Sequence, residues 1–197
     1  AHGSTPWEGE NAISGLMAEI AESKIDCPLA RFYMEKIGTD LHGERINLAL
    51  ADAASGKLSL NVGKVFETDD MVKLALDIRF PVTYSLDTVL ARLKEAVSPY
   101  DIEVEVAADM KPVYMEKDGK IIQKLMEAYR EVTGDSAEPI VMGGGTYARA
   151  MDNIVAFGPV FPGRECTEHK KDEYIFVEDL EKARQIYRLA IEKLTEV

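Results

Sequence analysis

The architecture of the chain is set by LSLNVGKVFETDDMVKLALDIRFP, residues 58–81. Apolar residues alternate with polar or small ones over residues 58–63 and again over residues 72–80, on either side of Thr68-Asp69-Asp70. A period of two places successive side chains on opposite faces of a strand. The stretch therefore predicts an antiparallel hairpin with one buried and one polar face, which Pro81 ends.

Helices and one further strand are expected around this hairpin. Apolar residues at helical spacing predict helices that begin near Ala12 and Pro28, and a third, short helix is expected from Glu44 to Asp52. Ser85 is placed to cap a fourth helix. Alternating apolar residues at 102–106 predict a third strand. A strand–strand–helix–strand unit of this kind is a small α/β sandwich, an antiparallel sheet with its helices on one face.

The composition and patterning of the sequence change near residue 110, which predicts two domains, residues 1–110 and 111–197. In the second, a helix is expected from Asp118 to Gly134, followed by a short strand at 154–157. A closing helix is expected to pack through Leu180, Ala183, Ile186, Tyr187, Ala190 and Leu194. The expected fold class is therefore mixed α/β throughout.

A second informative stretch, GGGTYARAMDNIVAFGPVFPGRECTEH at 143–169, carries residues suited to chemistry. Three successive glycines let a chain turn tightly or bring backbone N–H groups close to a ligand. His169, presented from a loop beside Glu168, suits a metal ligand or an acid–base group. The open alternatives are an ordinary turn and a bystander histidine. A phosphate-binding P-loop is disfavoured, because Thr146-Tyr147 stands where that motif needs lysine and a hydroxyl residue.

Two residues of the first half could act together with His169. Arg79 lies at the end of a strand on its polar face, and His2 lies in a Gly-Ser-Thr-Pro turn. Arginine binds carboxylates through two parallel N–H groups, and an imidazole can bind a metal or donate to an oxyanion. One alternative is a disordered terminal His2. Another is a cross-strand ion pair of Arg79, which shares a face with Lys73 and Asp77 and lies near Glu103 and Glu105. We interpret His42, in a polar turn, as solvated.

Composition excludes several other classes of protein. The net charge of −12 on 197 residues disfavours nucleic acid and anionic membrane surfaces as partners, and no apolar run approaches a membrane span of roughly 20 residues. Cys27 and Cys166 are isolated thiols, which favours a reducing compartment and a cytoplasmic protein. A cysteine hydrolase using Cys166 is disfavoured, because no orienting third group accompanies the nearby histidine.

Four segments resemble those of a known enzyme family, in the same order along the chain. Residues 2–12 (HGSTPWEGENA) are similar to the motif that opens a lid-domain helix in the di-zinc aminoacylase/carboxypeptidase metallopeptidases. Residues 76–81 (LDIRFP) resemble the lid strand that carries their substrate-binding arginine. Residues 143–173 resemble their last metal-ligand region, and residues 52–63 (DAASGKLSLNVG) resemble the PepV-type bacterial dipeptidase branch.

The resemblance implies a role for each candidate residue. His169 would bind one of two zinc ions, His2 would stabilise the tetrahedral oxyanion, and Arg79 would hold the terminal carboxylate of a dipeptide substrate. The backbone at three positions would line the substrate cleft: Gly144, Gly145 and Thr146. The first domain would be the lid and the second a segment of the catalytic domain.

The family's His-x-Asp, bridging aspartate and Glu-Glu pair precede the lid histidine, and only Ala1 precedes His2 here. We therefore expect a C-terminal portion of a zinc-dependent dipeptidase, in which metal-activated water attacks the peptide bond. Without its missing N-terminal catalytic half, the chain should be inactive and bind zinc poorly.

Three other functions stay open. A related N-acyl-amino-acid deacylase would use the same residues. A non-catalytic assembly module would form a homodimer through the edge of the lid sheet, and an anion-binding domain would use the glycine stretch.

Overall fold

The computed structural model describes residues 2–68, 71–158 and 160–195. The chain divides into two compact units, and each is described by itself. Unit 1 comprises Ala1–Met110 with Met142–Gly144, and unit 2 comprises Lys111–Val141 with Gly145–Val197. In the described part of the chain, small antiparallel sheets accompany five α-helices, which confirms the expected mixed α/β class.

Unit 1 is built on the predicted hairpin. Strands β3 (Ser59–Glu67) and β4 (Val72–Arg79) pair antiparallel, with a register shift between Val62 and Lys64. Leu60 and Val62 of β3 are buried, and the alternate apolar residues of β4 pack on the same core. A second, shorter pair joins β1 (Ala51–Asp52) to β2 (Gly56–Lys57).

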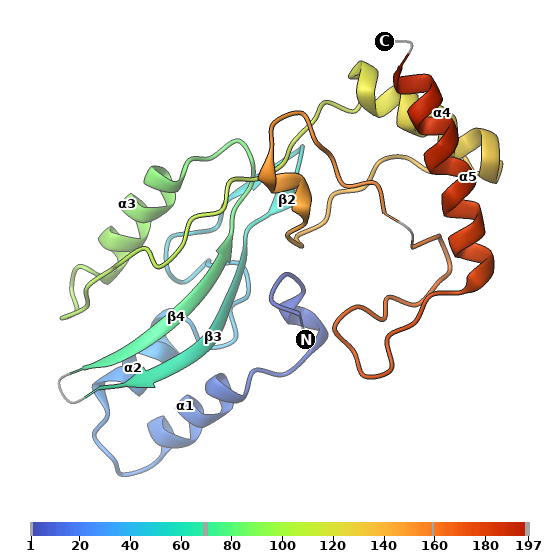
Figure 1. Cartoon of the computed structure of the whole chain (residues 1–197). Helices are drawn as coiled ribbons and strands as arrows, with labels where there is room; N and C mark the ends of the chain where they lie inside the picture. Colours follow the sequence, from blue (N-terminus) through green and yellow to red (C-terminus); the bar gives the residue numbers. More distant parts are fainter. Residues whose placement is uncertain (1, 69–70, 159, 196–197) are drawn as a thin grey trace. The chain divides into compact units, whose positions relative to one another are not determined.

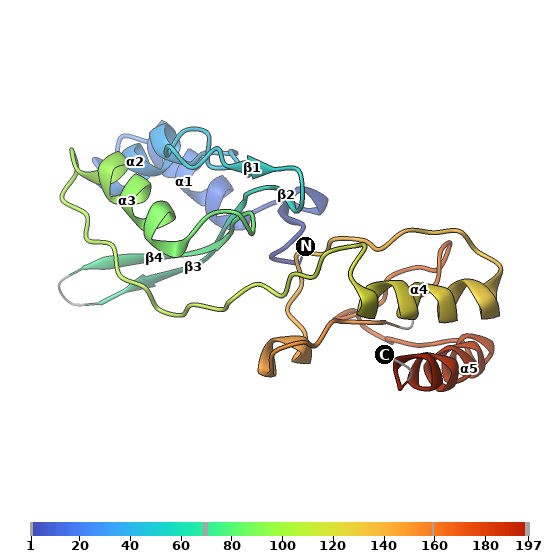
Figure 2. The same cartoon turned by 90° about the horizontal axis from the view of Figure 1, so that it is seen from above.

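Three α-helices lie on the same side of the β3–β4 ribbon (Figures 1 and 2). They are α1 (Ala12–Glu22), α2 (Pro28–Lys36) and α3 (Leu86–Val97), preceded by a 3-10 helix η1 (Pro6–Glu8). Asn11 Oδ1 caps α1 by accepting from the backbone N–H of Ile13 at 2.9 Å, and Ser85 caps α3 as predicted. Pro28 begins α2, also as predicted.

Two elements predicted for this unit are wrong. Residues 44–52 form a turn and an extended segment instead of a helix, because Gly43 (φ 72°) and Asn47 (φ 62°) adopt left-handed backbone conformations. The extended segment buries Ile46, Leu48 and Leu50, which alternate along it. Residues 102–106 are irregular, because β4 pairs only with β3 among the described residues.

Unit 2 consists of two long helices and irregular segments. Helix α4 (Lys120–Thr133) ends at Gly134, whose φ of 69° suits a left-handed cap. It packs against α5 (Val177–Leu194) through Leu125, Ala128 and Ala190. A 3-10 helix, η2 (Tyr147–Ala150), lies between them in the sequence.

Two expectations for unit 2 are also wrong. Residues 154–157 form no strand, although Val155 and Phe157 pack against the helices. Leu180 of α5 was expected to face inward but is 55% exposed. Tyr187 is 39% exposed, packs edge-on against Phe157 with 5.9 Å between ring centroids, and donates from its hydroxyl to the Phe157 carbonyl at 2.8 Å. Among the described residues, no helix combines the length and apolar character that crossing a bilayer requires.

Candidate active site

Arg79 ends β4 on the polar face of the hairpin, where it forms a two-pronged ion pair. Its Nε donates to Asp77 Oδ1 at 3.1 Å, and its Nη2 donates to Asp77 Oδ2 at 2.7 Å. Nη1 donates to the backbone carbonyl of Gly143. The partner is thus two residues back on the same strand. A second ion pair joins Lys73 Nζ of β4 to Glu105 Oε1 at 2.9 Å.

His2 lies in the turn that precedes η1. The Thr5 backbone N–H donates to the His2 carbonyl at 3.0 Å, which closes the turn. The Ser4 backbone N–H donates to His2 Nδ1 at 3.3 Å, and the Ser4 hydroxyl lies 2.7 Å from the same nitrogen. An accepting Nδ1 favours the neutral tautomer with its proton on Nε2. Such an imidazole can donate a hydrogen bond to an oxyanion.

Two glycines allow the His2 turn to lie against the ion pair. A Cβ on Gly3 would lie 2.7 Å from Asp77 Oδ2 and 3.3 Å from Arg79 Nη2. A Cβ on Gly143 would lie 2.7 Å from Ser4 Cβ. At Gly143 the clash is with a Cβ, so this position needs glycine, whereas a Cβ at Gly3 would force the Asp77 carboxylate to shift. Unit 1 therefore brings together the His2 turn, the Arg79 guanidinium and the segment that contains Gly144.

Asp52 fixes the loop between β1 and β2 to the turn that follows β4. Its Oδ1 accepts from the Ser55 backbone N–H at 2.5 Å and the Ser55 hydroxyl at 2.9 Å. Its Oδ2 accepts from the Thr83 backbone N–H at 3.2 Å and the Thr83 hydroxyl at 2.9 Å. Burial opposes ionisation, but these four hydrogen bonds outweigh it and lower the pKa of Asp52 to about 2. The turn beyond Arg79 is thereby anchored.

His42 has a structural role instead of the solvated position expected for it. It is half-buried, and its Nδ1–H donates to the Leu58 carbonyl at 2.8 Å. Its ring centroid lies 6.2 Å from that of Trp7.

The remaining glycine-stretch candidates belong to unit 2. Thr146 caps η2, and its Oγ1 accepts from the Ala148 backbone N–H at 3.2 Å. A Cβ on Gly145 would lie 3.4 Å from the guanidinium of Arg149, which is a tight contact. The role of Gly145 and Thr146 toward a substrate stays a prediction.

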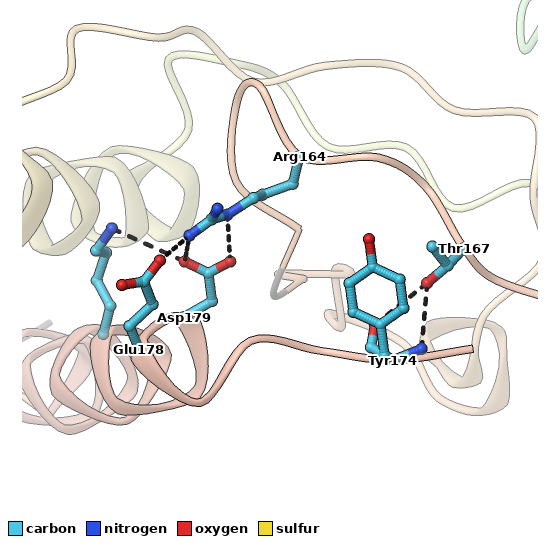
Figure 3. A network of polar contacts seen from close by, with 6 residues as sticks. Arg164, Thr167, Tyr174, Glu178 and Asp179 are labelled. Atoms are coloured by element: carbon cyan, nitrogen blue, oxygen red, sulfur yellow. Dashed lines mark hydrogen bonds and ion pairs between the residues drawn. The ribbon is translucent and has the colours of Figure 1, made fainter. Parts of the chain in front are cut away.

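His169 lies on the loop 164–176, whose first residue is bound firmly to the start of α5 (Figure 3). Arg164 Nε donates to Asp179 Oδ2 at 2.7 Å, and its Nη2 donates to Asp179 Oδ1 at 3.0 Å and to Glu178 Oε1. The guanidinium also lies 4.1 Å above the Phe176 ring. Asp179 is only 3% exposed. The hydrogen bonds that Arg164 donates to Asp179 and then to Glu178 raise the pKa of Arg164 above its usual value.

The two sides of this loop are joined again nearer its tip. Thr167 Oγ1 donates to the Tyr174 carbonyl at 3.2 Å and accepts from the Tyr174 backbone N–H at 3.4 Å (Figure 3). Beyond this bridge, His169 (φ 62°) and Asp172 (φ 59°) adopt left-handed conformations, and His169 is exposed. His169 is therefore presented from a turn.

The described residues do not form a zinc site by themselves. Within them, no three His, Cys, Asp or Glu side chains are grouped closely enough to hold a metal ion. A catalytic zinc needs about three protein ligands and an open position. His169 can supply at most one of these.

Sequence comparisons connect these residues to known proteins. The model of "Peptidase family M20/M25/M40" matches residues 8–193. "Putative dipeptidase SSP1012" from Staphylococcus saprophyticus is 34% identical over 197 residues, which is 98% of this chain and 42% of the relative. "Putative dipeptidase YtjP" from Bacillus subtilis is 33% identical, and "Putative dipeptidase SAUSA300_1697" from Staphylococcus aureus is 30% identical, with the same coverage.

The chain thus spans 42% of the length of these relatives. The family model, in contrast, matches this chain almost from end to end, and the match includes β4 with Arg79 and the loop with His169. On this evidence the chain belongs to the peptidase family M20/M25/M40.

Proposed function

We propose that the protein to which this chain contributes is a zinc-dependent dipeptidase of the di-zinc, PepV-type branch, which hydrolyses the peptide bond of dipeptides. The observation that carries the proposal is the grouping of the His2 turn, Arg79 and the Gly143 segment in unit 1. Family membership and the names of the relatives support the same reaction class. Within this proposal, unit 1 is lid and unit 2 is a segment of the catalytic domain.

The chemistry of a dipeptide explains why these groups need to be close. Its terminal carboxylate lies one residue from the scissile carbonyl, so one site must recognise both. We assign the carboxylate to the Arg79 guanidinium, which binds such groups through parallel N–H bonds. We assign the developing oxyanion to the Nε2–H of His2. The backbone of Gly144, Gly145 and Thr146 would line the remainder of the site.

Of the described residues, we assign only His169 to the proposed zinc centre. We propose that this imidazole is one ligand and that the other ligands and the general base lie outside the described residues. The chain on its own is then expected to bind zinc weakly and to lack activity. Isothermal titration of zinc into the chain and its His169→Ala variant tests this: both should bind in the same weak range.

A deacylase acting on N-acyl amino acids would place its carboxylate on Arg79 as well. The discriminating experiment compares the whole protein on alanyl-alanine, its C-terminal amide and N-acetylalanine. A dipeptidase should prefer alanyl-alanine to both. Preference for N-acetylalanine would favour the deacylase, and no hydrolysis of any of the three would refute a peptide-hydrolase function of either kind.

The site assignment is tested by two substitutions in the same protein. Arg79→Gln should lower kcat/KM for alanyl-alanine by about 100-fold, because charge-assisted hydrogen bonds to the substrate are lost. His2→Gln should lower kcat by about 100-fold through the loss of oxyanion stabilisation. Wild-type rates in both variants would show that these residues lie away from the reaction.

A further inference from the structure

Asp77 is absent from the functional assignments above, yet it determines which edge of the Arg79 guanidinium is accessible. A guanidinium has five N–H groups. The Nε–H and one Nη2–H donate to Asp77, and one Nη1–H donates to Gly143. Within the described ranges, no further residue accepts from the two that remain, one on Nη1 and one on Nη2. Asp77 occupies the side edge formed by Nε and Nη2, which leaves the end edge formed by Nη1 and Nη2 for a substrate carboxylate.

The contacts of Asp77 hold its carboxylate in place. It lies on the same face of β4 as Arg79, and the backbone of Gly3 packs against its Oδ2 so closely that no Cβ fits between them. The two hydrogen bonds from Arg79 and the backbone of Gly3 together hold the Asp77 carboxylate beside the guanidinium. A substrate carboxylate has to approach the end edge, because Asp77 continues to occupy the side edge.

The net charge of the Asp77–Arg79 ion pair also affects how a ligand is recognised. Asp77 and Arg79 together are neutral, so a negative ligand gains little from net charge at this point. Recognition instead depends on two N–H groups that point in fixed directions, which matches the two oxygens of a carboxylate. A guanidinium without its carboxylate partner would sample several rotamers, and ordering it on binding would cost conformational entropy.

We propose that Asp77 is a positioning residue that makes the site specific for substrates with a free terminal carboxylate. It holds the end edge of Arg79 toward the substrate, and through Gly3 it supports the turn that carries His2. This inference rests on the proposed function, in which Arg79 binds the substrate carboxylate.

The first test uses the whole protein with Asp77→Asn, assayed on alanyl-alanine and its C-terminal amide. Asparagine keeps the shape but cannot accept both N–H groups with charge assistance. KM for alanyl-alanine should rise about tenfold with kcat within about twofold, since directed bonds to the carboxylate are weakened. The preference for the acid over the amide should fall by the same factor. Glu105→Gln is the matched control, because it removes the same charge from the Lys73 pair on β4 and should change nothing.

The second test needs no activity. In the NMR spectrum of the 197-residue chain, the Nε–H of Arg79 should be protected from exchange with water. Protection should be lost in Asp77→Asn and retained in Glu105→Gln.

The outcomes separate this inference from the proposed function. If Arg79→Gln abolishes the preference for the acid but Asp77→Asn preserves it, the positioning role is wrong and the role of Arg79 stands. If Asp77→Asn lowers kcat equally for acid and amide, Asp77 is merely structural and the inference fails. If the wild type does not distinguish acid from amide, both assignments are wrong.

Discussion

Unit 1 and unit 2 differ in how they bury apolar side chains. In unit 1, residues from α1, α2, α3 and β3 form one continuous core that includes Tyr33, Leu48 and Leu60. In unit 2, two small clusters form around α4 and α5, one at Leu125 and one at Phe161. A single continuous core is what allows a small domain to fold independently.

Both units expose large apolar side chains, such as Ile25 (67%) and Met110 (69%) in unit 1, but the most exposed of them lie in unit 2. Ile140 is 87% exposed, Tyr147 97% and Val177 77%. Monomeric proteins rarely leave so many large apolar side chains in solvent on a small unit. Exposed apolar surface is unfavourable in water, so we expect unit 2 to be less stable by itself than unit 1. Unit 1, proposed as lid, thus buries its apolar side chains more completely than unit 2, proposed as a segment of the catalytic domain.

The largest effect is expected when the two units are expressed separately. Residues 1–110 expressed alone should unfold in urea in one cooperative transition, with a stability of about 5 kcal/mol, near the lower bound for native domains. Residues 111–197 alone should show a shallow transition and bind the dye ANS, because their apolar surface stays accessible. Circular dichroism and dye fluorescence measure both. A cooperative transition in residues 111–197 would contradict the expectation that unit 2 is less stable by itself than unit 1.

Single core substitutions sharpen the same comparison. Leu60→Ala in β3 should cost about 3 kcal/mol of unfolding free energy, because Leu60 is 1% exposed in a close-packed core. Leu125→Ala should cost about 2 kcal/mol, since its small cluster can collapse around the cavity. Leu16→Ala, at a site that is 51% exposed, is the control and should change stability by less than about 0.5 kcal/mol. Urea unfolding of the full chain gives all three values. Equal losses of unfolding free energy in Leu60→Ala and Leu125→Ala would show that the cores of the two units do not differ in packing.

Order within unit 2 is expected to depend strongly on one ion pair. Arg164→Met leaves the buried carboxylate of Asp179 with Lys182, 4.0 Å away, as its one remaining cationic partner among the described residues. The loop 164–176 should then open more often, and trypsin should cleave after Lys170 or Lys171 about tenfold faster. Mass spectrometry of timed digests measures the rate. Arg184→Met removes an exposed arginine from α5 and should leave it unchanged. Equal rates in wild type and Arg164→Met would show that the pair does not hold the loop.

Elements with a complete local signal were predicted from the sequence, and elements that need a partner were not. The hairpin follows from its period of two, and the starts of α2 and α3 follow from Pro28 and Ser85. The strands predicted at 102–106 and 154–157 have the right alternation or composition, but among the described residues no strand pairs with them. The false helix at 44–52 had a contrary signal, the alternation of Ile46, Leu48 and Leu50, which the helical interpretation passed over.

The candidate site follows the same division. Arg79 was placed on the polar face because alternation fixes the face of a strand, and the same rule places Asp77 beside it. Asp77 was expected on this face, but the ion pair of Arg79 was expected across strands, and Glu105 pairs with Lys73 instead. Arg164 and Asp179 were missed because the loop between them determines their contact, and loop closure leaves no periodic pattern. Gly3 and Gly143 become interpretable only when the atoms that their missing side chains would meet are known.

The smallest expected effect is a pH dependence confined to unit 1. The pKa of Asp52 is lowered to about 2 in the folded chain, below the ordinary value of 3.8, so the folded state binds this proton less readily than the unfolded state. Its contribution to stability is therefore fully present above pH 3.8 and is lost as the pH falls toward 2. The urea midpoint of residues 1–110 should drop between pH 5 and pH 2.5, and Asp52→Asn should reduce that drop. Asp101→Asn, at an exposed position, should retain the full drop. An unchanged pH profile in Asp52→Asn would mean that the hydrogen bonds from Ser55 and Thr83 do not favour the ionised carboxylate, and the anchor beside Arg79 would then depend on packing alone.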